Sequence, residues 1–93
     1  MLERSVTVGW PEGLHARPAS VFCRAVTSAG VAVTVRKGDG PPVNAASMLG
    51  VLSLGAEHGD EIVLASEQEG AQGALERLVK LVSDGLEELP ETV

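Results

Sequence analysis

The sequence predicts an α+β fold, an open-faced sandwich in which helices pack on one face of a four-stranded antiparallel sheet. Segments with strand-like alternation and segments with helical periodicity follow one another in the order β-α-β-β-α-β-α. The chain has 93 residues, of which 44% are hydrophobic, which is enough for one core but too short for two domains. We therefore expect residues 1–93 to form a single domain.

The first half of the chain predicts a strand, a helix and a second strand. Residues 2–8 end in β-branched alternation, and residues 31–37 show the same pattern, so both are expected to be strands. Apolar residues recur at helical spacing over residues 16–28, and Gly30 can end that helix. The predicted buried stripe of the helix consists of Ala19, Phe22, Cys23 and Val26.

A turn separates the second predicted strand from the third. Residues 38–42 are glycine, aspartate and proline, the residue types that form turns, and a short strand is expected around Val43. Residues 47–54, bounded by Ser47 and Gly55, predict a short helix. Residues 60–66 predict the last strand.

The last predicted element is a longer helix over residues 70–88. Glu76 and Lys80 stand four residues apart on its polar side, so we expect a weak ion pair there. The predicted buried stripe of this helix consists of Ala71, Leu75, Leu78, Val79, Val82 and Leu86.

Charge and cysteine content limit the classes of partner. A net charge of −6 argues against binding to nucleic acid or to anionic membranes. No apolar run approaches the roughly 18 residues of a membrane span, so no membrane insertion is expected. The one cysteine, Cys23, cannot form an internal disulfide and fits a reducing cytoplasm. Two histidines and one cysteine give no metal-ligand spacing, and we expect neither a metal ion nor another cofactor.

The segment GLHARPAS, residues 13–20, places His15 at the start of the first predicted helix. With His15 as the N-cap, the backbone amides of Ala16 and Arg17 have no helical acceptor, and Pro18 has no amide to lose. These amides and the positive end of the helix dipole predict an anion site. Arg17 adds a guanidinium that suits phosphate oxygens, and a neutral imidazole is a good nucleophile. The pattern therefore predicts that His15 carries a phosphoryl group.

The outer side of the same helix is a candidate docking face. Two arginines share this side with His15 in a chain that is acidic overall, which favours a partner with an acidic rim. The residues expected to point outward, opposite the buried stripe, are Arg17, Ser20, Val21, Arg24 and Ser28. Of these we expect Ser20, Val21 and Arg24 to contact partners.

Two segments resemble the signatures of a known family. GLHARPAS is similar to the phosphorylation-site signature of the histidine-containing phosphocarriers (HPr) of the bacterial phosphotransferase system. VNAASMLGVLSLGAEHGDEI, residues 43–62, is similar to the second signature of that family. The order of the predicted elements also matches, so the resemblance covers nearly the whole chain.

The resemblance implies a stoichiometric phosphoryl carrier in sugar uptake rather than an enzyme. It implies that His15 accepts a phosphoryl group at Nδ1 from Enzyme I, which obtains it from phosphoenolpyruvate, and passes it to A domains of sugar permeases. It also implies that Arg17 lies beside the phosphate and that Ser47 is a regulatory phosphorylation site for a serine kinase and phosphatase. A monomer is expected, because a carrier must release its partners quickly. The apolar patch that the resemblance implies for partner docking consists of Met48, Leu49 and Leu52.

The sequence differs from the family pattern in three places. The turn over residues 38–42 is one residue longer than in the commonest members. Ala45 and Ala46 stand before Ser47, where bulkier or charged residues are often found, and this bears on recognition by a kinase. Trp10 lies in the loop before the predicted phosphorylation site and has no assigned role at this point.

Three alternative functions stay open at this point. A regulatory module would use the same face to bind a transcriptional regulator or a kinase, although the presence of both His15 and Arg17 favours transfer. A carrier of the nitrogen-related or glycerone-kinase branch would differ only in its partners. A histidine-based hydrolase lacks motif support, because the chain has no nucleophile elbow, no Gly-rich phosphate loop and no obvious carboxylate to orient His15.

Overall fold

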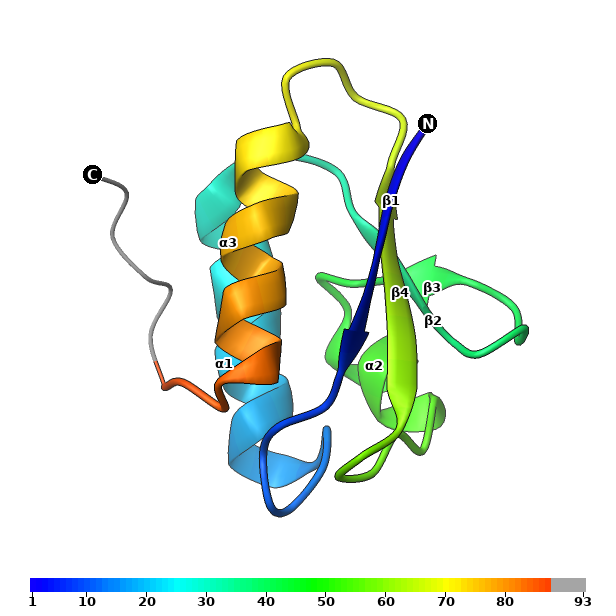
Figure 1. Cartoon of the computed structure of the whole chain (residues 1–93), viewed down its shortest axis with the longest axis vertical. Helices are drawn as coiled ribbons and strands as arrows, with labels where there is room; N and C mark the ends of the chain where they lie inside the picture. The colour runs from blue at the N-terminus through cyan, green and yellow to red at the C-terminus, as the bar shows by residue number, and fades with distance from the viewer. Residues whose placement is uncertain (88–93) are drawn as a thin grey trace.

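The computed structural model describes residues 1–87 and contains the seven elements in the order that the sequence predicts (Figure 1). One layer is a sheet and the other is made of helices, so the expected α+β open-faced sandwich is confirmed. The elements are β1 (Leu2–Thr7), α1 (Ala16–Ala29), β2 (Thr34–Lys37), β3 (Val43–Asn44), α2 (Met48–Ser53), β4 (Glu61–Ser66) and α3 (Gln72–Ser83).

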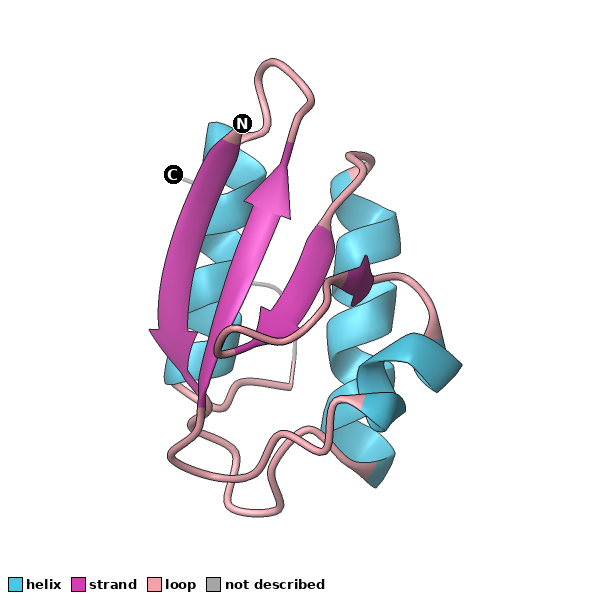
Figure 2. Ribbon diagram, turned by 90° about the vertical axis from the view of Figure 1, so that its right-hand side faces the viewer, coloured by secondary structure: helices cyan, strands magenta, loops and turns pink. Residues whose placement is uncertain are grey.

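The sheet is antiparallel throughout, with the strand order β1-β4-β2-β3. Strand β4 lies in the middle, where Val63 pairs with Ser5 of β1 and with Arg36 of β2. Figure 2 looks onto the open face of the sheet, with α1 and α3 behind it. On this face the Arg36 guanidinium of β2 lies 3.7 Å from the carboxylate of Glu3 in β1, on the other side of β4.

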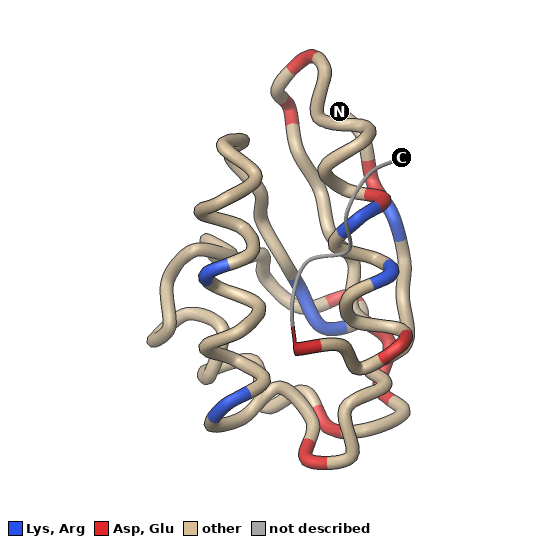
Figure 3. The backbone as a smooth tube through the Cα atoms, turned by 90° about the vertical axis from the view of Figure 1, so that its left-hand side faces the viewer, with Lys and Arg blue, Asp and Glu red and all other residues tan. Residues whose placement is uncertain are grey.

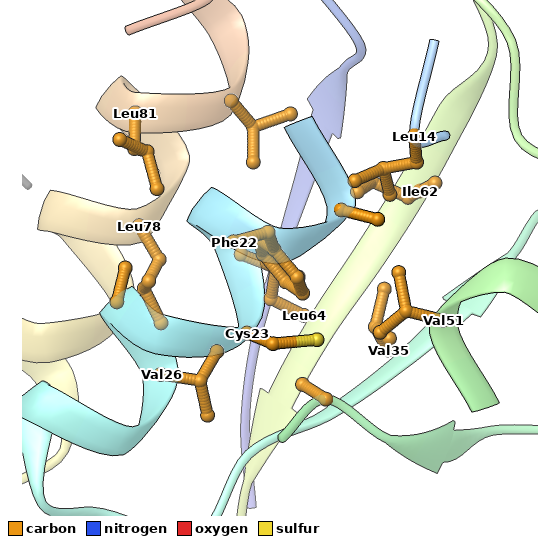
Figure 4. Close-up of a cluster of buried hydrophobic side chains, with 14 of the residues drawn as sticks. Leu14, Phe22, Cys23, Val26, Val35, Val51, Ile62, Leu64, Leu78 and Leu81 are labelled. Carbon is orange, nitrogen blue, oxygen red and sulfur yellow. The ribbon is translucent and has the colours of Figure 1, made fainter. Parts of the chain in front are cut away.

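The core lies between the sheet and the helices (Figure 4). Alternation along β4 places Ile62 and Leu64 on the covered face, where both are fully buried. Phe22 of α1 and Leu78 of α3 pack into the same cluster. All four predicted stripe residues of α1 are buried, which confirms that face. Of the six residues predicted for the buried stripe of the last helix, Val79 and Leu86 are only partly buried, and Leu86 lies beyond the end of α3. Leu81, outside the predicted stripe, is fully buried.

Two element boundaries differ from the prediction by three residues or more. Strand β2 begins at Thr34 rather than at residue 31, because the Ala32 amide donates to the Gln68 side chain at 3.0 Å instead of to a strand. Helix α3 runs from Gln72 to Ser83, so the predicted helix is wrong for residues 70–71 and 84–87, and residue 88 lies outside the described residues.

A Schellman-type turn ends α3. Gly85 has φ +62° and donates to the carbonyl of Val82, while the Leu86 amide donates to the carbonyl of Leu81 at 3.0 Å. Helical periodicity in the sequence does not predict the end of α3 at this turn, because apolar Leu86 continues the pattern beyond it.

The expected ion pair between Glu76 and Lys80 is also wrong. The Glu76 carboxylate lies 3.6 Å from the Arg4 guanidinium, and Lys80 Nζ lies 3.2 Å from the Asp84 carboxylate.

No helix within residues 1–87 combines the length and the apolar character needed to cross a bilayer.

Candidate functional site

The loop before His15 is fixed to the rest of the fold. The Leu14 amide donates to the carbonyl of Ala56 at 2.8 Å, and the Leu14 side chain is fully buried. Gly13 has φ +77°, and a Cβ at this position would lie 2.7 Å from Glu57 Cα. Only glycine fits this combination of dihedral angle and close backbone approach. His15 therefore directly follows a loop whose backbone is fixed to the rest of the fold.

His15 is the N-cap of α1, as predicted. Its backbone is extended, with φ −129° and ψ 160°, and its carbonyl accepts the amide of Ala19 at 3.5 Å. The side chain makes no capping hydrogen bond. The ring is half-buried, and within residues 1–87 neither ring nitrogen has a hydrogen-bond partner. The imidazole is thus open to a reaction partner.

The start of α1 carries free donors. Within the described residues, the backbone amides of Ala16 and Arg17 have no acceptor, and both residues are exposed. Pro18, which has no amide, is buried against the fold. The orphan donors that the sequence predicts at this helix start are therefore present next to His15.

Ala16 adds a feature that the sequence does not signal. Its φ is +49°, in the left-handed region, and it is the one non-glycine residue with positive φ in the described part of the chain. A residue with a Cβ pays about 1–2 kcal/mol for this conformation. An alanine at a first helical position is ordinary in sequence, so this strain is visible only in the structure.

Arg17 lies on the surface beside the helix start. Its Nη1 is 3.7 Å from Oε1 of Glu87, and both side chains are about three-quarters exposed, at 77% and 75%. The only charged residues of α1 are Arg17 and Arg24, both basic and both exposed. Figure 3 shows basic positions but no acidic ones along α1, whereas basic and acidic positions are mixed on and around α3. Glu87 belongs to no motif, so the sequence did not indicate it.

The predicted outward face needs one correction. Val21 is only 6% exposed and belongs to the core, so the prediction that it points outward to partners is wrong. Trp10, Pro18 and Gly85 line a cavity of about 150 Å³ together with Val21, and they cover this side of α1. The buried stripe of the helix is therefore wider than predicted. Of the other predicted outward residues, Ser20 is half-buried, and Arg17, Arg24 and Ser28 are exposed.

Trp10 has a structural role that the sequence left open. Its side chain is 4% exposed, and its indole Nε1–H donates to the carbonyl of Leu86 at 2.9 Å. The ring thus joins the loop before His15 to the segment after α3. The hydrogen bond spans 76 positions of sequence, a separation that no local pattern reveals.

Residues 43–62, the second segment that resembles a family signature, include an apolar patch on α2. The Ser47 hydroxyl accepts the Gly50 amide at 3.1 Å and caps the helix, as the N-cap position predicts. Met48, Leu49 and Leu52 are the exposed side of α2, and Leu49 is 81% exposed, whereas Val51 is fully buried. Helix α2 packs against α1. These three side chains, here called the apolar patch, therefore lie on the helix next to the one that His15 caps.

A charged turn supports the loop that holds Leu14. Oδ2 of Asp60 accepts the Glu57 amide at 2.9 Å and lies 3.3 Å from Lys37 Nζ. The backbone hydrogen bond and then the lysine lower the pKa of Asp60 from its ordinary 3.8. His58 is exposed in the same turn.

Cys23 is buried in α1, and burial raises the pKa of its thiol. A buried thiol of this kind has a packing role.

Within residues 1–87, no group of three or more His, Cys, Asp or Glu side chains is placed to hold a metal ion.

The chain is similar to known phosphocarriers along most of its length. A family model described as "PTS HPr component phosphorylation site" matches residues 2–84. The phosphocarrier protein HPr of Streptomyces coelicolor is 72% identical over 93 residues, which is 100% of each chain. The HPr-like protein Crh of Bacillus subtilis is 37% identical over 84 residues, covering 90% of this chain and 98% of that protein. The crystal structure of HPr-C-His from Thermoanaerobacter tengcongensis superimposes with a TM-score of 0.81 at 30% identity, covering 100% of both chains.

Proposed function

The chain belongs to the HPr family of phosphocarriers of the phosphotransferase system, and from this we propose that His15 is the residue that carries the phosphoryl group. Enzyme I, which takes the group from phosphoenolpyruvate, is the donor. A domains of sugar permeases are the acceptors during sugar uptake. In this scheme the protein works in the cytoplasm as a monomer.

The observation that carries this proposal is the placement of the His15 ring. The ring is accessible at the N-cap of α1, and the free amides of Ala16 and Arg17 follow it directly. Phosphate oxygens on the ring accept these amides and meet the positive end of the helix dipole. The guanidinium of Arg17 supplies a charged donor fork within the same turn.

The transfer step needs only groups that the two proteins supply. The lone pair of Nδ1 attacks phosphorus, the N–P bond forms, and the bond from phosphorus to the donor breaks with its electron pair kept by the donor. The proton of the neutral ring stays on Nε2. Onward transfer reverses the step: a nucleophile of the acceptor attacks phosphorus, and the electron pair of the N–P bond returns to Nδ1.

The site suits a carrier better than an enzyme with its own turnover. His15, Ala16 and Arg17 lie on the surface, so a partner can approach phosphorus from outside. Few contacts hold the phosphoryl group, so it stays easy to give away. Among the described residues, no side chain hydrogen-bonds to the His15 ring to orient it, unlike the carboxylate of a hydrolase triad.

The docking surface in this proposal joins α1 and α2. Arg24 and Ser20 offer polar contacts on α1, and the apolar patch offers buried area on α2. Enzyme I and the permease domains use this surface in turn, because each must reach His15. A serine kinase acting on Ser47 adds negative charge beside the patch and weakens docking, and transcriptional regulators that read this state bind the same surface.

The test is incubation with phosphoenolpyruvate and Enzyme I, followed by mapping of the modified residue by mass spectrometry. The wild-type chain is expected to gain one acid-labile phosphoryl group on His15, and His15→Ala to gain none. His58→Ala is the matched control, because His58 is the other histidine of the chain and lies exposed in a turn. Labelling of the His15→Ala variant, or loss of labelling in the His58→Ala variant, contradicts the proposal.

A further inference from the structure

We propose that Asp60 is a positioning residue for phosphoryl transfer at His15. Asp60 acts through a single peptide group, the unit that joins Ala56 to Glu57, because this unit is bonded to Asp60 on one side and to Leu14 on the other. The inference rests on the proposed function, because it names a further residue for the reaction proposed at His15.

The peptide unit between Ala56 and Glu57 is hydrogen-bonded at both of its polar groups. Its carbonyl oxygen, which belongs to Ala56, accepts the Leu14 amide at 2.8 Å. Its N–H, which belongs to Glu57, donates to Oδ2 of Asp60 at 2.9 Å. A trans peptide unit is planar, so its C=O and N–H point in fixed and nearly opposite directions. A carboxylate that orients the N–H therefore also orients the carbonyl that holds Leu14.

The charge of Asp60 also strengthens the bond to Leu14. Hydrogen bonds to an ionised acceptor are stronger than those between neutral groups, and hydrogen bonds in a chain polarise one another. The amide of Asp60 donates to the carbonyl of Glu57 at 2.9 Å, which closes the turn and keeps the carboxylate next to the Glu57 amide. The Ala56 carbonyl is therefore a better acceptor for Leu14 than it would be with a neutral side chain at position 60.

Lys37 holds the carboxylate from the sheet. Its Nζ lies 3.3 Å from Oδ2 of Asp60 and donates to the carbonyl of Gly55, also at 3.3 Å. Gly55 directly precedes Ala56, and Lys37 is the last residue of β2, so one lysine connects this loop to the sheet. The two charged side chains are 44% and 37% exposed, so water weakens their attraction. We therefore expect the backbone hydrogen bond of Asp60 to contribute more than its ion pair.

The side chain and the amide of Leu14 fix different properties of the chain before His15. The side chain lies in the core cluster together with Ile62 of β4 and fixes where the chain passes (Figure 4). The amide hydrogen bond fixes the direction in which the backbone continues into His15. Phosphoryl transfer requires the attacking nitrogen to be aligned with phosphorus, and small misplacements slow such a step strongly. Loss of the Asp60 carboxylate is therefore expected to slow transfer even though Leu14 stays buried.

Docking is expected to be unaffected, because Asp60 belongs to neither α1 nor α2. The distinguishing signature of a positioning role is thus a lower kcat with an unchanged KM when Enzyme I phosphorylates the chain. A variant that damaged the docking surface would raise KM instead.

The experiment measures both constants for three variants with phosphoenolpyruvate and Enzyme I. Asp60→Ala removes the acceptor and the charge, and is expected to lower kcat about three- to tenfold, the rate equivalent of one weakened hydrogen bond. Asp60→Asn keeps a neutral oxygen for the Glu57 amide and is expected to recover part of that loss. Gly30→Ala is the matched control, because it strains the backbone at the opposite end of α1 from His15, and its kcat is expected to equal that of the wild type.

The amide signal of Leu14 in a proton–nitrogen NMR spectrum reports the hydrogen bond directly. In Asp60→Ala this signal is expected to move upfield and to exchange faster with solvent, and in Gly30→Ala it is expected to stay in place. The same spectra show whether each chain is folded, and Asp60→Asn supplies both readouts if Asp60→Ala does not fold.

Two outcomes overturn the inference alone. They are a kcat of the folded Asp60 variants equal to that of Gly30→Ala, and a Leu14 amide signal that the loss of the carboxylate leaves unchanged. In both cases phosphorylation of the wild type on His15 leaves the proposed function standing. Absence of any phosphorylation of the wild type overturns both.

Discussion

The backbone amide of Leu14 donates a 2.8 Å hydrogen bond to the carbonyl oxygen of Ala56, and this bond ties the loop before α1 to the loop before β4. Both side chains are fully buried, so the bond is protected from water. The two sequence segments that resemble family signatures thus meet in space. The position of His15 depends on this junction, because His15 follows Leu14 directly.

Gly13 is expected to be the least replaceable glycine of the junction. Gly13→Ala combines φ +77° with a Cβ 2.7 Å from Glu57 Cα, and should lower the free energy of unfolding by about 3 kcal/mol. Gly30→Ala is the matched control, since Gly30 has φ +72° but open space around its Cβ, and should cost about 1 kcal/mol. Urea unfolding measures both. Equal losses would show that the close approach to Glu57 does not matter.

Ser47 caps α2 whatever its role in regulation. Ser47→Ala removes the acceptor for the Gly50 amide and should destabilise the fold by about 1 kcal/mol in urea unfolding. Ser47→Asp keeps a capping oxygen and should retain near wild-type stability, while its charge beside the apolar patch weakens binding to Enzyme I. Titration calorimetry measures that binding. A Ser47→Asp variant that binds as tightly as the wild type would argue against a regulatory effect at this surface.

Leu49 is expected to contribute to docking rather than to stability. Its side chain is 81% exposed, so Leu49→Ala should change the free energy of unfolding by less than about 0.5 kcal/mol. Binding to Enzyme I should weaken about tenfold, because a central apolar contact is lost. Lys80→Ala on α3 serves as the control and should bind normally. Unchanged affinity of Leu49→Ala would remove the apolar patch from the docking surface.

The turn around Asp60 is expected to lose stability in acid. A carboxyl group whose pKa is lowered by folding contributes stability above its unfolded pKa, and this contribution disappears as the pH falls through the folded pKa. For Asp60 that window lies below 3.8, so its contribution is complete at neutral pH. Asp60→Asn should therefore reduce the urea midpoint at neutral pH but not in strong acid. Asp39→Asn, in the exposed turn over 38–42, is the control, and equal behaviour of the two variants would contradict the assignment.

Local patterns were sufficient for most of the fold. Periodicity gave the type and order of the seven elements, Gly30 ended α1 with φ +72°, and Ser47 capped α2 as their residue types indicate. The errors arose where distant segments interact. The Gln68 side chain accepts the hydrogen bond of the Ala32 amide, and β2 is shorter than predicted. The turn at Gly85 ends α3 before the apolar pattern of the sequence ends.

The parts of the candidate site that depend on local sequence were predictable, and the parts that depend on distant segments were not. The N-cap position of His15 and the free amides after it follow from the rules of helix ends, which are local. The burial of Val21 and the partner of Trp10 depend on the segment after α3, far away in sequence. The positive φ of Ala16 has no signal in its residue type, so only the structure reveals it.

The most direct measurement for the central claim is proton–nitrogen NMR of the isotope-labelled chain before and after phosphorylation by Enzyme I. Amides that donate to phosphoryl oxygens become deshielded, so the signals of Ala16 and Arg17 should show the largest downfield shifts. The Ala45 amide, already bonded to the carbonyl of Val33 at 3.0 Å, should hardly move. Signals of Ala16 and Arg17 that stay in place while His15 carries the phosphoryl group would contradict the account.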